Sequence, residues 1–169
     1  MREISFRHDI LPLKDKLYRL ALRITLDTAE AEDVVQDTLV KVWNLREQWG
    51  QMESVEAYCL TMVRNLAIDR SRSSDRQNEE LTPETQQLPD GGSPEEQIER
   101  REQLRLVRRL ISGLPEKQRT VLHLRDVEGK SYKEIAAVLR LTEEQVKVTL
   151  FRARQHIRMK YNEIDNYGL

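Results

Sequence analysis

The sequence predicts an all-α protein, built as two small helical domains joined by a flexible acidic linker. Apolar residues recur at helical spacing along most of the chain, and no run alternates between apolar and polar residues. Glycine and proline are few, whereas residues 75–93 lose the apolar periodicity altogether. A chain of 169 residues is long enough for two small domains. We therefore expect an N-terminal domain over 1–74, a linker over 75–93 and a C-terminal domain over 94–169.

Three helices are expected in the N-terminal domain. Pro12 suits the first turn of a helix that ends near Thr25, and Asp27 can cap a second helix over about 29–45. A polar break follows, and Ser54 can cap a third helix that ends near 73. The residues expected inside are Leu13, Leu17, Leu20, Ala21 and Ile24 in the first helix, Ala31, Val34, Val35, Leu39 and Val42 in the second, and Val55, Tyr58, Met62 and Leu66 in the third.

The expected linker is acidic and poor in large apolar side chains. Residues 76–103 hold eight acids and three bases, a net charge of −5. Because the whole chain carries −1, the remainder carries +4. Such a segment cannot bury enough surface to offset its ordering entropy, so we expect it to be flexible. The remaining positive charge is mild for a nucleic-acid-binding protein, which favours a protein that needs a partner to hold it on DNA.

The C-terminal domain contains the pattern of a helix-turn-helix. Ser93 and Pro94 start its first helix, and capping boxes at Ser131 and Thr142 mark two later helix starts. The last helix repeats apolar residues at Val146, Leu150, Ala153 and Ile157. Its other faces are basic, with Lys147, Arg152, Arg154, Arg158 and Lys160. A helix that is buried along one stripe and basic elsewhere suits the major groove of DNA.

Several functional classes are disfavoured by the composition. Cys59 is the single cysteine, so no disulfide can form within the chain, and we expect a packed thiol. The N-terminus lacks the apolar run of a secretion signal, and no window of about 18 apolar residues exists. The histidines His8, His123 and His156 are scattered, and no phosphate-binding glycine loop is present. We expect a cytoplasmic protein that is not an enzyme and holds no metal or cofactor.

Three motifs, taken in order, resemble the extracytoplasmic-function (group IV) sigma factors of bacterial RNA polymerase, in the sigma-70 family. AEDVVQDTLVKVW (31–43) resembles their polymerase-binding helix, and VEAYCLTMVRNLAIDRSRS (55–73) resembles their promoter-melting helix. LPEKQRTVLHLRDVEGKSYKEIAAVL followed by VKVTLFRAR resembles their region 4. The resemblance covers nearly the whole chain. It implies that 1–74 is sigma region 2 and that 94–169 is sigma region 4.

The resemblance implies roles for residues of region 2. Exposed side chains of the second helix would dock on the clamp helices of the largest polymerase subunit; these are Asp33, Gln36 and Asp37. The following break and the third helix would contact the −10 element and receive an extruded base. The residues implied are Leu45, Arg46, Trp49, Arg64, Asn65 and Arg72. Trp49 would offer a stacking face for the base; the alternative is that it fills the core under a loop.

The resemblance implies that region 4 reads the −35 element. The residues implied are Arg125, Ser131, Tyr132, Glu144, Gln145, Lys147, Val148, Phe151 and Arg152. Lys147 and Arg152 would meet guanine edges or phosphates, and Gln145 an adenine. Arg125, Ser131 and Tyr132 would hold the DNA backbone. Phe151 lies off the buried stripe, which leaves two alternatives open, apolar contact with DNA or packing on the preceding helix.

The partners implied are core RNA polymerase, through the clamp helices and the flap of the second-largest subunit, promoter DNA, and an anti-sigma factor. We expect no membrane insertion and a monomer when the protein is free. The alternative function is that of a stand-alone helix-turn-helix transcriptional regulator. A regulator of the response-regulator type would need a receiver domain of alternating strands and helices, and residues 1–73 show a helical pattern throughout.

Overall fold

The computed structural model describes residues 3–73 and 92–166, and within these ranges it is helical with no strand. The N-terminal half contains α1 (Lys14–Thr25), α2 (Thr28–Asn44) and α3 (Val55–Ser73). A π-helical turn η1 (Phe6–Ile10) and a 3₁₀ turn η2 (Leu11–Leu13) precede α1, and a 3₁₀ turn η3 (Arg46–Gln51) follows α2. The all-α prediction is confirmed. The predicted flexibility of 75–93 falls almost entirely on 74–91, which lie outside the described residues.

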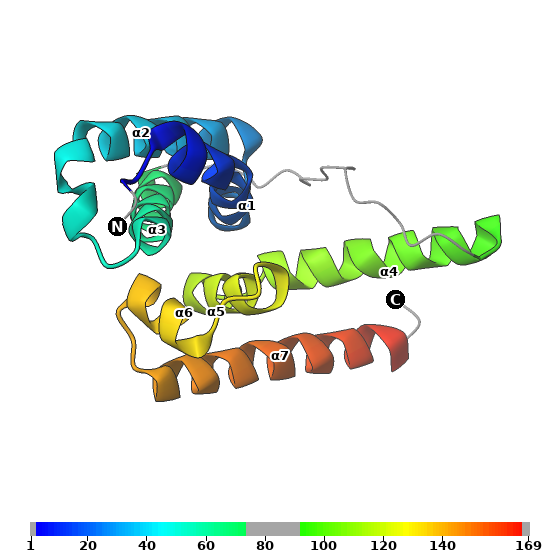
Figure 1. Ribbon diagram of the computed structural model, residues 1–169. Coiled ribbons are helices and arrows are strands. Elements are labelled where there is room, and N and C mark those ends of the chain that lie inside the picture. Colours follow the sequence, from blue (N-terminus) through cyan, green and yellow to red (C-terminus); the bar gives the residue numbers. More distant parts are fainter. Residues whose placement is uncertain (1–2, 74–91, 167–169) are drawn as a thin grey trace.

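The C-terminal half contains α4 (Pro94–Ser112), α5 (Glu116–Leu122), the π-helical turn η4 (His123–Val127), α6 (Tyr132–Leu139) and α7 (Glu143–Asn166). A capping box between Ser93 and Glu96 starts α4. The helix nevertheless buries no residue, and Ile98 in its second turn and Leu104 near its middle are exposed. Figure 1 shows that this end of α4 extends past the rest of the C-terminal half.

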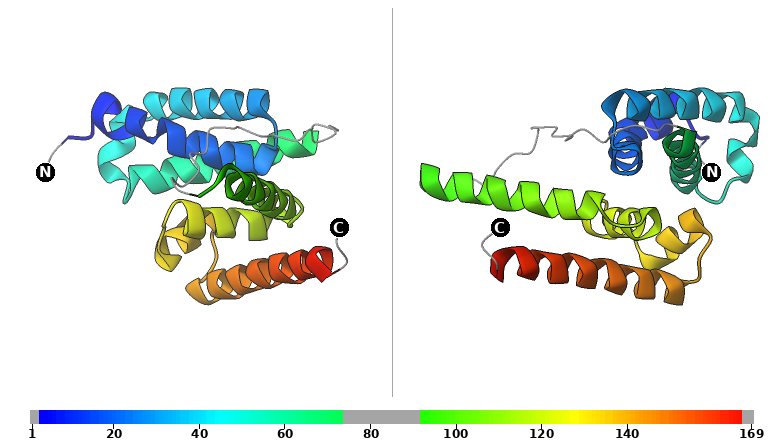
Figure 2. Two further views of the ribbon diagram at one scale, coloured as in Figure 1. Left: turned by 90° about the vertical axis from the view of Figure 1, so that its right-hand side faces the viewer. Right: turned by 180° about the vertical axis from the view of Figure 1, so that it is seen from behind.

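The helices stack in layers (Figures 1 and 2). α2 and α7 lie on opposite outer sides, whereas α1 and α3 face the C-terminal half. There, α1 packs on α5 and η4, and α3 packs on α6. The two halves are therefore in direct contact through the inner layers, and the outer faces of α2 and α7 point away from each other.

The buried core of the N-terminal half follows the predicted stripes in α1 and departs from them in α2 and α3. Leu17, Leu20, Ala21 and Ile24 are buried as expected. In α2 the structure also buries Thr38, whose hydroxyl donates to the Val34 carbonyl at 2.8 Å. In α3 the predicted side chains are half-buried, and the fully buried ones are Cys59, Leu60, Val63 and Ala67. The correction for α3 has a simple cause: the helix packs on α1 and α2 on one side and on α6 on another.

Cys59 is completely buried, as predicted. Burial raises the pKa of its thiol to about 11, with a further contribution from the charge of Glu56. In residues 3–73 and 92–166, no helix is long and apolar enough to cross a membrane.

Candidate nucleic-acid interface

The helix-turn-helix is formed by α6 and α7. Each helix begins with a reciprocal pair of hydrogen bonds, between Ser131 and Glu134 in α6 and between Thr142 and Gln145 in α7. Arg140 ends α6 in the left-handed conformation, with φ of 56°, and its amide donates to the Ala136 carbonyl. Both predicted capping boxes are confirmed. They define the short turn that orients α7.

The outer face of α7 is exposed along its first three turns. Val146, Leu150 and Ala153 are buried on the inner side, as the stripe predicted. On the outer side, Phe151 is 62% exposed and Val148 is 44% exposed. The exposure of Phe151 excludes the alternative in which it packs on the preceding helix. Exposed apolar side chains beside charged ones suit contact with the thymine methyl group in the major groove.

Tyr132 brings two basic side chains of the predicted DNA-binding set together. The Arg125 guanidinium lies 4.4 Å and the Lys147 ammonium 5.6 Å from the centroid of its ring. Arg125 also donates to the Lys130 carbonyl at 2.9 Å. Cation–π contacts hold both cations above an aromatic face. Lys147 also forms an exposed ion pair with Glu144 at 3.9 Å, one turn earlier in α7. The result is a charged surface along the first three turns of α7, where Glu144, Gln145 and Arg152 are also exposed.

The structure corrects the predicted role of Trp49. Its indole is 6% exposed, and its Nε1–H donates to the Val42 carbonyl at 2.9 Å. The ring packs in an aromatic cluster with Phe6 and Trp43, at centroid distances of 6.5 and 6.2 Å. Trp49 therefore fills the core under η3 and offers no face to an extruded base. Trp49 is buried because its ring packs on other aromatic side chains and its N–H finds a carbonyl acceptor.

Trp43 is the exposed aromatic residue beside η3, which the sequence did not single out. It is 44% exposed, and the Arg46 guanidinium lies 4.6 Å from its ring centroid. Arg46 also donates to the Trp43 carbonyl, and Leu45 ends α2 half-buried. In the sequence, a tryptophan at helical spacing among apolar residues cannot be distinguished from a core residue. The exposure of Trp43 is evident only from the way α2 packs in the structure.

The predicted −10 residues of α3 differ in their surroundings. Asn65 is exposed, whereas the Arg64 side chain is 17% exposed. Two guanidinium nitrogens of Arg64 donate to the two carboxylate oxygens of Glu116, at 3.0 and 2.8 Å. Glu116 belongs to α5, so this ion pair joins the two halves. The side chain of Arg72 lies outside the described residues.

The predicted polymerase-binding residues lie together on the outer face of α2. Asp33, Gln36 and Asp37 are all exposed. Arg70 of α3 reaches both carboxylates, at 3.6 Å from Asp33 and 2.6 Å from Asp37. The arginine fixes the positions of the two acids while leaving much of their surface open.

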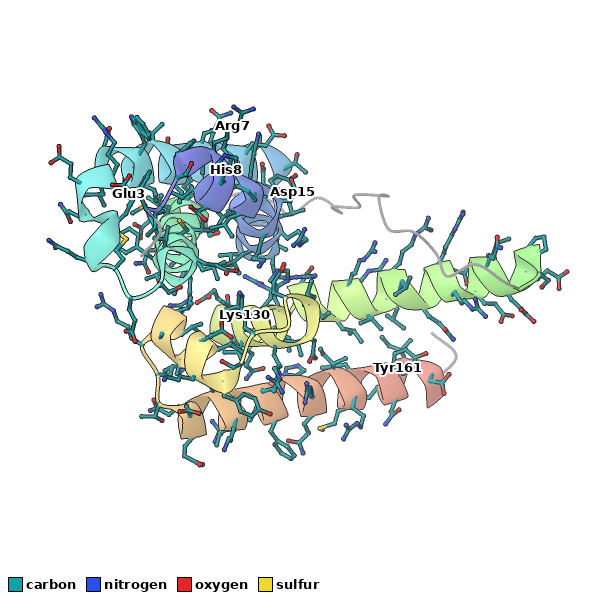
Figure 3. The ribbon with its side chains drawn as sticks, in the orientation of Figure 1. Glu3, Arg7, His8, Asp15, Lys130 and Tyr161 are labelled. Carbon is teal, nitrogen blue, oxygen red and sulfur yellow. The ribbon has the colours of Figure 1, made fainter. Side chains whose placement is uncertain are left out.

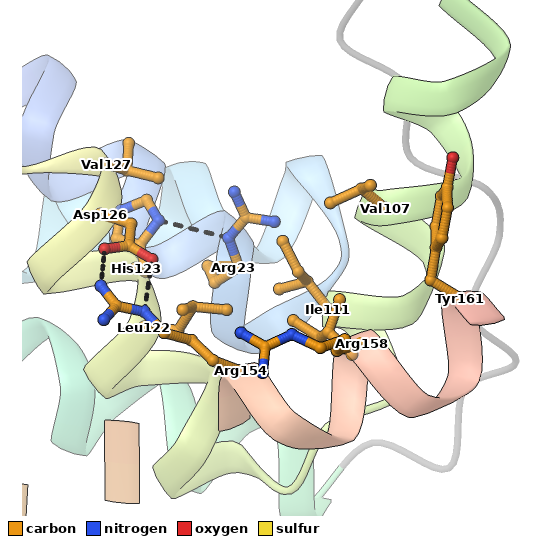
Figure 4. A pocket seen from close by; sticks show the side chains of 11 residues that line it. Arg23, Val107, Ile111, Leu122, His123, Asp126, Val127, Arg154, Arg158 and Tyr161 are labelled. Atoms are coloured by element: carbon orange, nitrogen blue, oxygen red, sulfur yellow. Dashed lines mark hydrogen bonds and ion pairs between the residues drawn. The ribbon is translucent and has the colours of Figure 1, made fainter. Parts of the chain in front are cut away.

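A cavity of about 480 Å³ lies between α1, α4, η4 and α7 (Figure 4). Its walls include Ile111 and Leu122, and three arginines also line it: Arg23, Arg154 and Arg158. None of the residues assigned to the −10 element, the −35 element or the polymerase lines this cavity, although Arg154 and Arg158 belong to the basic faces of α7. Within the described part of the chain, no group of His, Cys, Asp or Glu is arranged to hold a metal ion.

His123 at the cavity wall connects the two halves. The Nε–H of Arg23 donates to its Nδ1 at 3.2 Å (Figure 4). The Nε2 of His123 lies 3.1 Å from Glu128. Because Nδ1 accepts a hydrogen bond, the ring is neutral with its proton on Nε2. Burial lowers the pKa of His123, although the hydrogen bond to Glu128 opposes this. Burial would raise the pKa of Glu128, but hydrogen bonds from Arg19 and His123 bring it below its ordinary value.

Comparison with known protein families matches both halves to the sigma-70 family. The model of sigma-70 region 2 matches residues 10–77, and that of sigma-70 region 4 matches residues 104–157. The fold is also similar to a sigma factor RpoE solved with the anti-sigma factor NepR from Bartonella quintana. Identity there is 22% and the TM-score 0.72, over 91% of this chain and 94% of the other. The fold is likewise similar to CnrH, solved with the cytosolic domain of CnrY. Sequence identity to CnrH is 22% and the TM-score is 0.70, over 94% of this chain and 88% of CnrH.

Curated relatives narrow the family further. The chain is 32% identical over 149 residues to the ECF RNA polymerase sigma factor SigL of Mycobacterium tuberculosis, covering 88% of this chain and 84% of SigL. It is 27% identical over 160 residues to SigW of Bacillus subtilis, covering 89% and 86%. The chain belongs to the extracytoplasmic-function RNA polymerase sigma factors. The predicted resemblance is confirmed, and a stand-alone regulator is not favoured.

Proposed function

We propose that the chain directs core bacterial RNA polymerase to promoters that carry a −35 and a −10 element, and that it helps to melt the −10 region. The observation that carries the proposal is the exposed outer face of α7, with Lys147 held beside Tyr132 and Arg125 at one end. Family membership supports the same role. The chain would serve as the specificity subunit, in the cytoplasm, with no catalytic residues of its own.

At the −35 element, α7 would enter the major groove by its first turns. Lys147 and Arg152 would contact guanine edges or phosphates, Gln145 an adenine, and Val148 and Phe151 thymine methyl groups. Arg125, Ser131 and Tyr132 would hold the backbone, since the helix before the recognition helix crosses the phosphates. Glu144 would accept from a cytosine amino group.

At the −10 element, Asn65 would meet the edge of an extruded base, and Arg64 and Arg72 would hold phosphates. Leu45 and Arg46 would border the base. Because Trp49 is buried, it has no part in this proposal; Trp43 offers an exposed ring with Arg46 already stacked on it. Extruding a base costs a few kcal/mol of stacking, which contacts in the pocket offset.

For partners, we propose that Asp33, Gln36 and Asp37 dock on the clamp helices of the largest subunit and that region 4 meets the flap of the second-largest subunit. The two structural neighbours were solved with an anti-sigma factor and with the cytosolic domain of CnrY, which supports a partner of this kind here. The free chain would be a monomer.

Run-off transcription from a genomic library, with core polymerase and with or without the protein, tests the proposal. Starts that require the protein and share two upstream elements are expected. Binding to one DNA element without core polymerase, and no new starts, would instead support a stand-alone regulator.

Asn65→Ala tests the −10 assignment on a promoter found in this way. Open-complex formation should fall while binding to core polymerase is retained, because the side chain is exposed and off the α2 docking face. Asn162→Ala, an exposed position near the end of α7, is the matched control. Loss of core binding in Asn65→Ala would contradict the assignment.

A further inference from the structure

The cavity of about 480 Å³ between α1, α4, η4 and α7 is lined by none of the residues assigned to the −10 element, the −35 element or the polymerase. It has the volume of a small-molecule pocket, for which about 300–1,000 Å³ is usual. Its walls are mainly apolar; they are formed by Val107, Ile111, Leu122, Val127, Ile157 and Tyr161. The cavity is therefore a separate candidate site.

Helix α4 leaves apolar side chains partly uncovered beside this cavity. Although α4 packs on α7, it buries none of its residues. Val107 and Ile111 of α4 are half-buried, as are Ile157 and Tyr161 on the part of α7 that runs beside α4 (Figure 3). Apolar side chains that line a hollow lack the contacts that a filled core would give them. An apolar ligand in the cavity would supply those contacts.

The cavity also carries an excess of positive charge (Figure 4). Three arginines and one acid, Asp126, line it, and with His123 neutral the net charge is three minus one, or +2. Arg154 is already paired with Asp126, at 2.5 Å. Among the described residues, neither Arg23 nor Arg158 is paired with a carboxylate. Two of the three cations are therefore available to an anion.

Arg23 lies near other cations. Burial lowers the pKa of Arg23, and the charges of Arg108 and Arg119 lower it further, whereas the charge of Glu128 opposes this. Glu128 is already engaged by Arg19, through two hydrogen bonds of 2.8 and 2.9 Å. A partly buried cation among other cations is stabilised by an anion beside it. The surroundings of Arg23 therefore favour an anionic ligand in the cavity.

We propose that this cavity binds a small amphipathic anion of the fatty-acid class, whose apolar chain lies between α4 and α7 and whose carboxylate faces Arg23 and Arg158. Volume favours a small molecule over a helix of a protein partner. Three helical turns, about 16 Å long and about 10 Å wide, occupy roughly 1,300 Å³. The cavity offers less than half of that volume. The site is independent of the proposed function, because it shares no residue with the surfaces assigned there.

Isothermal titration calorimetry of the full-length protein with decanoate tests the proposal without a substitution. One decanoate should bind per chain. Octanoate, which is two methylenes shorter, should bind about fifteenfold more weakly, because each buried methylene contributes roughly a factor of four. Decanol, which has the same chain length and no charge, should bind roughly tenfold more weakly, because it lacks hydrogen bonds between charged groups. Octanoate or decanol binding as tightly as decanoate, or several decanoates per chain, would overturn the proposal.

Two tryptophan substitutions in α4 test the place of the apolar chain. Val107→Trp fills part of the cavity and should abolish decanoate binding. Ile98→Trp, at an exposed position that does not line the cavity, should leave binding unchanged. Circular dichroism shows whether both variants fold. Equal decanoate binding by the two folded variants would overturn the proposal.

Arg158→Gln and Lys160→Gln each remove one positive charge from an exposed position of α7, and of the two only Arg158 lines the cavity. Decanoate binding should weaken roughly threefold in Arg158→Gln, the size of a partly exposed ion pair, and stay unchanged in Lys160→Gln. Equal affinities would contradict the position of the carboxylate. If the parent binds no decanoate and Val107→Trp instead weakens binding to core polymerase, this face serves a protein partner and the proposal is wrong.

Discussion

Helices α3 and α7 both carry residues proposed to bind promoter DNA, but their surroundings differ. α7 lies on an outer layer (Figure 1), and the side chains proposed to face DNA, including Phe151 and Val148, are exposed. α3 lies on an inner layer, where Arg64 is paired with Glu116 of the other half. The outer face of α7 is therefore open to solvent, whereas the faces of α3 are largely occupied by contacts with other helices.

The difference shows that a residue pattern predicts which side chains are exposed more reliably on an outer helix than on an inner one. On α7 the apolar stripe is buried against the C-terminal half, and the opposite face is exposed to solvent. On α3 the same kinds of residue serve the contacts with α1, α2 and α6. The following predictions test this contrast, starting with the largest expected effect.

Trp49→Ala should destabilise the protein by about 3–5 kcal/mol, the range for loss of a buried aromatic side chain. The substitution leaves a cavity and removes the hydrogen bond to Val42. Thermal or urea unfolding followed by circular dichroism measures the loss. Trp43→Ala, at a half-exposed ring of the same cluster, is the control and should cost clearly less. If both variants lost the same small amount of stability, Trp49 would not be a core residue.

Ser54→Ala and Thr142→Ala remove the caps of α3 and α7, and each should cost about 1 kcal/mol of stability. Ser54 accepts from the Ala57 amide at 3.1 Å, and Thr142 from the Gln145 amide at 3.1 Å. Thr142→Ala should also weaken binding to the −35 element, because the frayed turn carries Glu144 and Gln145. Thr142→Ser should restore both. If Ser54→Ala also weakened binding to the −35 element, the proposed separation of roles between α3 and α7 would be contradicted.

Stability should fall as the pH is lowered from about 6.5, through protonation of His123. Burial lowers its pKa in the folded protein from the ordinary value of 6.5, so between the two values the unfolded chain binds more protons. The contribution is present above 6.5 and is lost as the pH falls towards the lowered value. Urea unfolding across this range measures it. His123→Gln should flatten the profile, and His156→Gln, at an exposed site, should not.

Phe151→Ala should change stability by no more than about 0.5 kcal/mol, because the side chain is 62% exposed. Binding to a −35 duplex should weaken, which electrophoretic or anisotropy assays with the holoenzyme can measure. Leu150→Ala, one residue earlier on the buried stripe, should cost about 2–5 kcal/mol and provides the contrast. A large loss of stability in Phe151→Ala would show that it packs inside.

Much of this fold follows from local signals that act within a few residues. The caps at Ser54, Ser131 and Thr142 and the stripe of α7 could be predicted because each depends on neighbours along the chain. The burial of Trp49 could not, since it depends on the Val42 carbonyl and on the aromatic cluster that folding brings within reach. The acceptor of Thr38 lies one turn earlier in its own helix, but its burial depends on what packs against α2. The Arg64–Glu116 pair is 52 residues apart in sequence, and no local pattern announces it.

The burial of Cys59 has a practical and a biological consequence. With a thiol pKa of about 11, only about one molecule in ten thousand carries a thiolate at pH 7. Because the thiolate is the form that reacts with oxidants and alkylating agents, this cysteine is a poor redox sensor. A cysteine introduced on either outer helix could carry a fluorescent label without removing the native one.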